Sequence, residues 1–455
     1  MKKSLKVISL IISLVAGSAI YYHSGKLNLN NNIELKQVPL NISSLNVSNT
    51  SIWNIKTESN FVCFSIVFKN EGGRSFYKTP GLLDLTLNTV LEGAGKYNNI
   101  ELKKILTNNS ISISLDYTKD DLTVNCSCLE KYFDITIDLL CDILAKSHFN
   151  NENLEITKQN MIISINQSLF SPGNRASEKL NDMLFSKDHP YSSSYSLVLK
   201  SLPTYTRNDV LKCYDQLFST KNAEITIVSN LANSKIRNGF LKLFNSLGVK
   251  KNNFYKVEQS NIIIKPGITH VELDNPQSSV FFLFPNVNKN SKDYFAASIA
   301  NSIFGEVGLI SRLSKSVRDK NGLVYRIQSN LNNFDLCSYI LGNSDTRPEN
   351  VEEVIKLIKS EAKNIYENGI TQEELDLAKA KKFSQNIFDS NLSILNFILK
   401  IRNMEIADIS EVNQILDNYK NLSLNDVNKI IKKLFNPENL MFVDSGKSIS
   451  KGVSK

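Results

Sequence analysis

The chain repeats itself, and this repeat constrains its fold more than any other feature of the sequence. The segment Asn208-Asp209-Val210 recurs as Asn425-Asp426-Val427, about 217 residues further along. A hydroxyl residue stands three positions before the aspartate of each copy: Thr206 before Asp209, and Ser423 before Asp426. At this spacing the hydroxyl can cap the first turn of a helix. Because matched signals at one offset indicate duplication, we expect two copies of one fold in the 455 residues.

Both copies show the same succession of an apolar strand, a hairpin and two long helices. This order predicts an α+β fold of two homologous lobes that form a clamshell, each an antiparallel sheet with helices packed on one face. We place the lobes at residues 45–247 and 269–448, with a polar linker at 248–268. The paired segments are 61–68 and 279–284 (strand), 110–128 and 323–341 (hairpin, the second turning at Asn332-Asn333), 132–145 and 351–366 (first helix), and the helices that start near 153 and 372.

The first residues have the pattern of an export signal. Lysines at positions 2, 3 and 6 precede a mostly apolar run, and the small residues 17–19 follow it. We therefore expect residues 1–19 to be a signal peptide, or residues 7–22 to remain as a membrane tether. The run is shorter than the roughly 20 residues of a comfortable membrane span. Both alternatives place the protein in the periplasm or the cell envelope.

The composition excludes several classes of function. The net charge of +8 is spread thinly along the chain, so the sequence predicts no nucleic-acid partner. The six cysteines are scattered and form no Cys-x-x-Cys pair, so neither a zinc ribbon nor a redox site is indicated. We expect them to be small buried apolar residues.

Six short motifs follow one another along the chain. They are Thr79-Pro80-Gly81-Leu82, Glu92-Gly93-Ala94-Gly95, His189-Pro190-Tyr191, Phe304-Gly305, Ser311-Arg312-Leu313, and Arg318 through Tyr325. Together, in this order, they resemble the insulinase-like family of zinc metallopeptidases, which includes pitrilysin and the mitochondrial processing peptidase. The resemblance extends from about Leu45 over nearly the whole chain, and it implies the same two-lobed fold.

The zinc motif of that family, His-x-x-Glu-His, is missing at the matching positions. In active members one helix face carries two histidine ligands and a glutamate base. Asp84, Leu87 and Asn88 stand at these positions here, and the third ligand, a later glutamate, aligns with Ser164. Since leucine cannot take a proton from water, the resemblance implies a catalytically inactive homologue of the subunit type that holds no zinc.

No other residues of the sequence supply a replacement metal site. The two oxygen-bearing side chains of Asp84 and Asn88 are too few donors for a hard cation, and we interpret them as ordinary polar residues. We interpret His189 as a structural hydrogen-bonding residue. No two histidines are spaced to share a helical turn; they are His23, His148, His189 and His270.

Arg318 and Tyr325 match a pair that the second lobe of the family presents to the substrate. A tyrosine hydroxyl and a guanidinium can stabilise a developing oxyanion. In two-subunit relatives the zinc-free subunit supplies this pair in trans, so the resemblance implies a heterodimer with a zinc-bearing partner and a peptide substrate. The alternatives are that Tyr325 packs in a core and Arg318 only ends a helix, or that the chain is a structural subunit of an envelope complex without a role in proteolysis.

Overall fold

The computed structural model describes residues 40–248, 262, 264–306, 310–384, 390–404, 409–412 and 415–448. Every described residue belongs to one compact unit, Pro39–Lys455. The expected signal peptide, the alternative tether and most of the expected linker therefore lie outside the described residues. Within the described ranges, no helix is both long and apolar enough to cross a membrane.

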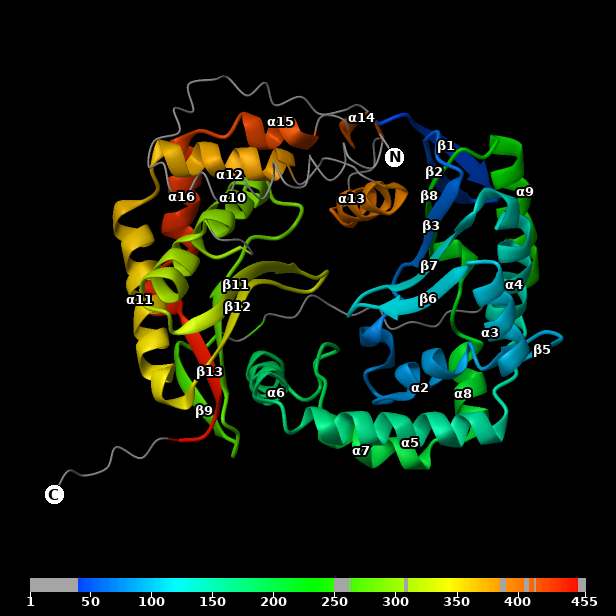
Figure 1. Cartoon of the computed structure of the whole chain (residues 1–455), viewed down its shortest axis with the longest axis horizontal. Coiled ribbons are helices and arrows are strands. Elements are labelled where there is room, and N and C mark those ends of the chain that lie inside the picture. Colours follow the sequence, from blue (N-terminus) through cyan, green and yellow to red (C-terminus); the bar gives the residue numbers. More distant parts are fainter. Residues whose placement is uncertain are drawn as a thin grey trace, which may run out of the picture. The chain divides into compact units, whose positions relative to one another are not determined.

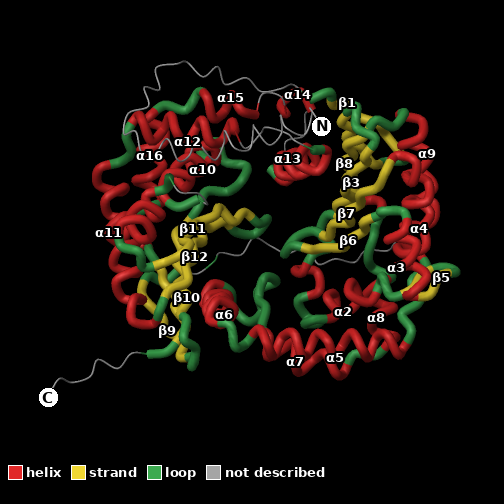
Figure 2. Tube along the Cα trace, viewed as in Figure 1, coloured by secondary structure: helices red, strands yellow, loops and turns green. Residues whose placement is uncertain are grey.

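Two main sheets organise these residues, and helices accompany both of them (Figure 1, Figure 2). The first half of the chain contains β1 (Ile42–Val47), β2 (Thr50–Lys56), β3 (Phe61–Phe68), α2 (Leu82–Thr89), β4 (Gly93–Ala94), β5 (Tyr97–Asn98), α3 (Asn99–Asn108), β6 (Ser112–Tyr117), β7 (Leu122–Leu129), α4 (Phe133–Ala145), α5 (Asn151–Ser168), α6 (Pro172–Leu184), α7 (Tyr195–Ser201), α8 (Arg207–Tyr214), β8 (Ala223–Ser229) and α9 (Asn233–Leu247). The second half contains β9 (Gly267–Glu272), β10 (Ser278–Pro285), α10 (Tyr294–Phe304), the π-helical segment η5 (Ser314–Lys320), β11 (Val324–Asn333), β12 (Ser338–Thr346), α11 (Val351–Asn368), α12 (Gln372–Ser384), α13 (Asn391–Asn403), α14 (Ile409–Val412), α15 (Ile415–Lys420), α16 (Leu424–Leu434) and β13 (Met441–Gly446).

Five strands of the first sheet correspond to the five strands of the second. The first sheet has the order β1-β2-β8-β3-β7-β6, and the second has the order β9-β13-β10-β12-β11, in which β9 matches β2. The edge strand β1 has no counterpart among the described strands of the second sheet. Pairing is antiparallel except for β2 with β8 and β13 with β9, which are parallel. The predicted duplication and α+β class are thus present in the structure. The single parallel pair in each sheet was not predicted, because it joins strands from opposite ends of each copy.

The expected turn of the second hairpin was misplaced. An Asn-Asn pair favours a turn, but β11 continues through Asn333, which pairs with Ser338. The chain reverses one step later, where the Phe334 amide donates to the Cys337 carbonyl at 2.9 Å. Asp335 and the residues beside it therefore occupy the tip of this hairpin.

Helix caps and core residues follow the sequence signals. Thr206 caps α8 with Asp209, and Ser423 caps α16 with Asp426, each as a reciprocal capping box. All six cysteines are buried and free, as expected. Figure 1 shows α4 and α9 side by side over the first sheet, where Phe64, Phe133 and Phe240 pack edge to face.

Replacing Ser423 by alanine should lower the free energy of unfolding by about 1 kcal/mol, because it leaves an N-terminal amide of α16 without its acceptor. Urea denaturation followed by circular dichroism measures this loss. Thr107→Ala is the control, since the Thr107 hydroxyl donates to a carbonyl of its own helix and caps nothing. If both variants lose the same free energy, the cap at Ser423 does not contribute as the geometry indicates.

A helix from the opposite half of the chain packs against each sheet. α6 contacts β13 and β10 of the second sheet, whereas α13 contacts β8 and β3 of the first. Strands β3 and β8 are consequently buried along nearly their whole length, whereas β7 alternates between buried and half-buried residues. Arg402 of α13 donates to the Ile225 carbonyl at 2.5 Å and lies 4.8 Å from the Trp53 ring centroid. The lobe boundaries at 45–247 and 269–448 remain a prediction.

Candidate functional site

The structure gathers three of the four degenerate zinc positions around one cavity. Asp84 and Asn88 on α2 and Ser164 on α5 line a cavity of about 760 Å³. Leu87, which the sequence analysis placed at the position of the catalytic base, is buried in the apolar core of the first half. α2 starts after Gly81, whose φ of 80° lies in the left-handed region that favours glycine. The assignment of these four residues to the zinc positions remains a prediction.

Asp84 and Asn88 of α2 both form hydrogen bonds within the protein. The Tyr117 hydroxyl donates to Asp84 Oδ1 at 2.8 Å, and Asn88 Nδ2 donates to the Asp84 carbonyl at 2.8 Å. Burial raises the pKa of Asp84 above its ordinary value, although the hydrogen bond from Tyr117 opposes this. Burial and the neighbouring Asp84 also raise the pKa of Tyr117. The side chains of Asp84 and Tyr117 thus hold each other in place.

The residues present do not fit the zinc ion of the family. Zinc sites are built from imidazole, thiolate and carboxylate donors, and the four matching positions offer one carboxylate, one amide, one hydroxyl and one leucine. Glu92 also lines the cavity, but it forms an ion pair with Lys103 at 3.1 Å. In the described part of the chain no group of three or more His, Cys, Asp or Glu side chains is placed to hold a metal ion.

The walls of the cavity are rich in amides and hydroxyls. Helices α5 and α6 contribute Asn160, Ser177 and Asn181, and β12 contributes Tyr339 from the second sheet. A second cavity of about 380 Å³ shares Asp84, Tyr117 and other lining residues with the first. Neutral donors and acceptors around an open space suit the backbone and polar side chains of a peptide.

Arg318 and Tyr325 lie together but are not among the residues that line these cavities. The guanidinium carbon of Arg318, on η5, is 5.8 Å from the ring centroid of Tyr325 at the start of β11. Tyr325 is 90% exposed, so the alternative in which it packs in a core is wrong. The structure thus brings the two residues into contact and leaves the tyrosine accessible.

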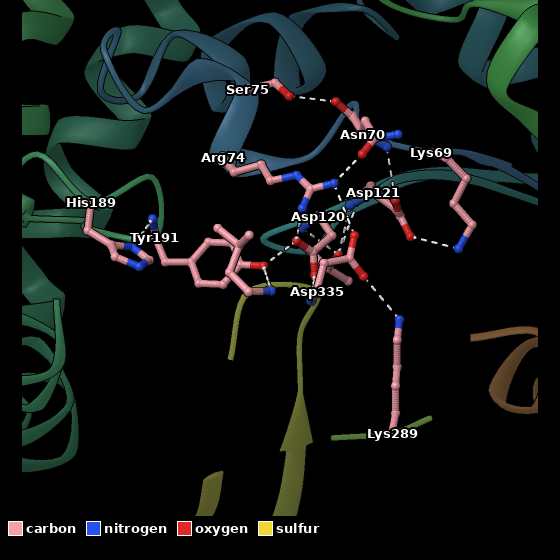
Figure 3. A network of polar contacts seen from close by, with 12 residues as sticks. Lys69, Asn70, Arg74, Ser75, Asp120, Asp121, His189, Tyr191, Lys289 and Asp335 are labelled. Atoms are coloured by element: carbon pink, nitrogen blue, oxygen red, sulfur yellow. Dashed lines mark hydrogen bonds and ion pairs between the residues drawn. The ribbon is translucent and has the colours of Figure 1, made fainter. Parts of the chain in front are cut away.

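A charged network beside the cavity joins the tips of the two equivalent hairpins (Figure 3). Arg74 forms ion pairs with Asp120 in the β6–β7 turn and with Asp335 in the β11–β12 turn, both at 3.0 Å. Lys289 reaches Asp335 at 3.1 Å. Burial raises the pKa of Asp335, but Lys289 and Arg74 outweigh it and hold the pKa below its ordinary value. Burial keeps the pKa of Asp120 above its ordinary value.

The His189-Pro190-Tyr191 loop supports this network. The Tyr191 hydroxyl donates to Asp120 and accepts from the Leu336 amide at 3.1 Å. His189 Nδ1 accepts from the Tyr191 amide at 2.9 Å, which confirms its interpretation as a structural residue. Burial lowers the pKa of His189. Sequence reasoning missed this network, because no local pattern indicates that residues more than 200 positions apart will meet.

Part of the chain matches a known family model, and several curated proteins resemble the chain. Residues 204–382 match the family model described as the peptidase M16 inactive domain. The non-peptidase homolog YmxG of Helicobacter pylori is 24% identical over 319 residues, which cover 70% of this chain and 72% of YmxG. Uncharacterized zinc proteases of Streptomyces coelicolor and Rickettsia felis are 20% and 24% identical over 255 and 268 residues. The match to the Streptomyces coelicolor protein covers 55% of this chain and 55% of that relative. The match to the Rickettsia felis protein covers 58% of this chain and 63% of that relative.

Solved structures share the fold. The crystal structure of a peptidase M16 inactive domain from Pseudomonas fluorescens has a TM-score of 0.83 at 22% identity, covering 90% of this chain and 99% of that one. The periplasmic protease PqqL of Escherichia coli has a TM-score of 0.71 at 16% identity, covering 93% of this chain and 49% of PqqL. These likenesses establish an M16-like α+β fold. Residues 204–382 of a chain with this fold match the peptidase M16 inactive domain.

Proposed function

We propose that this chain is the non-catalytic subunit of an exported heteromeric peptidase, and that it binds peptides together with a zinc-bearing homologue. One observation carries the proposal: the cavity of about 760 Å³ persists around Asp84, Asn88 and Ser164, although the groups that would hold zinc and activate water are absent. A cavity without catalytic groups can still bind the chain that another subunit cuts. The names of YmxG and of the Pseudomonas fluorescens domain describe non-peptidase or inactive proteins, which supports this role.

The exposure of Tyr325 favours a contribution in trans. Its hydroxyl is available to a substrate held by a second subunit, and the guanidinium of Arg318 lies close to its ring. Arg318 stands on a seven-residue π-helix, a rare conformation that occurs frequently at functional sites. The export pattern of residues 1–19, together with the description of PqqL as periplasmic, supports a periplasmic location.

Tyr325→Phe in this chain should lower kcat of the reconstituted pair about a hundredfold, because it removes a donor to the developing oxyanion. The experiment co-expresses the chain with a homologue that carries an intact His-x-x-Glu-His helix and follows cleavage of a fluorogenic peptide. Tyr366→Phe is the matched control, since Tyr366 lies on α11 with its ring beside Lys432 and away from both cavities.

Unchanged turnover of the Tyr325→Phe pair would show that this chain does not complement a partner. Stable association with an unrelated envelope complex would then favour the structural alternative. Stoichiometric zinc in the purified chain, with chelator-sensitive hydrolysis by that chain alone, would contradict the non-catalytic assignment.

A further inference from the structure

Lys119 occupies a central position between the two cavities. It lies in the turn after β6, two residues beyond Tyr117, and lines both the larger and the smaller cavity. Its Nζ donates to the Tyr191 carbonyl at 2.9 Å and lies 5.1 Å and 5.4 Å from the ring centroids of Phe185 and Tyr191. The ammonium is therefore fixed by one neutral acceptor and two aromatic faces.

The positive charge of the Lys119 ammonium is only partly compensated by its neighbours. A lysine ammonium has three N–H donors, and the structure assigns it one acceptor and no ion pair with a described carboxylate. Asp120, the neighbouring acid, is already bonded by Arg74 and Tyr191. Burial lowers the pKa of Lys119, although the nearby Asp120 carboxylate opposes this. Two donors of a partly desolvated cation thus remain for a ligand.

The other charged groups of the larger cavity are engaged elsewhere. Glu92 pairs with Lys103, and Glu178 pairs with Arg175 at 2.9 Å. Asp84 accepts from Tyr117, and its pKa is raised by burial. Among the described residues that line this cavity, Lys119 is the single Lys or Arg. An anion that enters the cavity meets one candidate cation.

We propose that Lys119 binds a carboxylate of the peptide in the cavity, either its C-terminal carboxylate or an acidic side chain. The inference rests on the proposed peptide-binding function and specifies the ligand chemistry of that site. A carboxylate supplies acceptors for the two remaining donors, and such charge-assisted hydrogen bonds are stronger than neutral ones. The aromatic rings of Phe185 and Tyr191 exclude water on one side of the ammonium, which strengthens the interaction.

The test measures the binding of three dye-labelled peptides to the full chain by fluorescence anisotropy. All share one uncharged sequence: the first has a free C-terminal carboxylate, the second is amidated with one internal aspartate, and the third is amidated without an acid. We expect the third peptide to bind about tenfold to a hundredfold more weakly than at least one of the others. Whichever of the first two binds tighter identifies the source of the carboxylate.

Lys119→Met should abolish the difference between the peptides, whereas Lys119→Arg should retain most of it. Lys187→Met is the matched control, because Lys187 is an exposed cation of the smaller cavity only. Equal binding of all three peptides, or a preference that survives in Lys119→Met, overturns the carboxylate site and leaves the peptide-binding function standing. Failure of all three to bind overturns both.

Discussion

Replacing Arg74 by methionine is expected to remove about 3–5 kcal/mol from the free energy of unfolding. The guanidinium bridges Asp120 and Asp335, and its side chain is 10% exposed. The two carboxylates lie close together, since the Asp335 amide donates to Asp120 at 3.0 Å. Without Arg74, Asp335 would keep its ion pair with Lys289, and Asp120 would lose its ion-pair partner. An uncompensated buried charge costs far more than a surface ion pair contributes.

Chemical denaturation of the full chain measures this loss. Arg347→Met provides the control, because Arg347 is 80% exposed and lies 4.0 Å from Glu349. A change within about 0.5 kcal/mol is expected there. A loss at Arg74 as small as that of the control would mean that water or counter-ions compensate the two aspartates, and that the network does not stabilise the contact between the hairpin tips.

Gly342→Ala should destabilise the second sheet by about 3 kcal/mol, at the upper end of overpacking effects in cores. A Cβ at this position in β12 would lie 1.9 Å from the ring of Phe282 on the paired strand β10. That ring is packed against Phe304 and Phe442, with centroids 6.2 Å and 6.5 Å away. The ring cannot retreat without displacing the aromatic core behind it.

Gly173→Ala on α6 is the matched control. The nearest atom to its Cβ would be the Ser279 hydroxyl at 3.5 Å, an ordinary contact, and alanine favours a helix over glycine by about 1 kcal/mol. We expect this variant to be as stable as the parent or slightly more stable in thermal and urea denaturation. Equal stability of the two alanine variants would contradict the close approach of Phe282.

Local signals in the sequence predicted much of the fold. The caps at Thr206 and Ser423, the apolar strand 61–68 and the paired hairpins are encoded by residues within a few positions of each other, so they can be recognised without tertiary information. The misplaced turn at Asn332-Asn333 shows the limit of such signals. There the pairing of β11 with β12 extended the strand beyond its turn-forming residues.

The candidate site was predicted in part. Asp84, Asn88 and Ser164 were found through the spacing of a degenerate motif, and they line one cavity. Lys119 was missed, because a lysine in a hairpin turn reads as an ordinary surface residue. Its importance comes from Phe185 and Tyr191, which are distant in sequence and reach it only in the folded chain.

The sequence by itself determined the duplication and the class of the fold, and it predicted degenerate zinc positions, because these depend on residue identity and short spacing. Only the tertiary structure decided that α6 packs on the second sheet and α13 on the first, and that Arg74 joins two hairpin tips. The amphipathic pattern of a helix specifies that it must bury an apolar face, but several sheets could satisfy it. The choice is made by the packing of the whole chain.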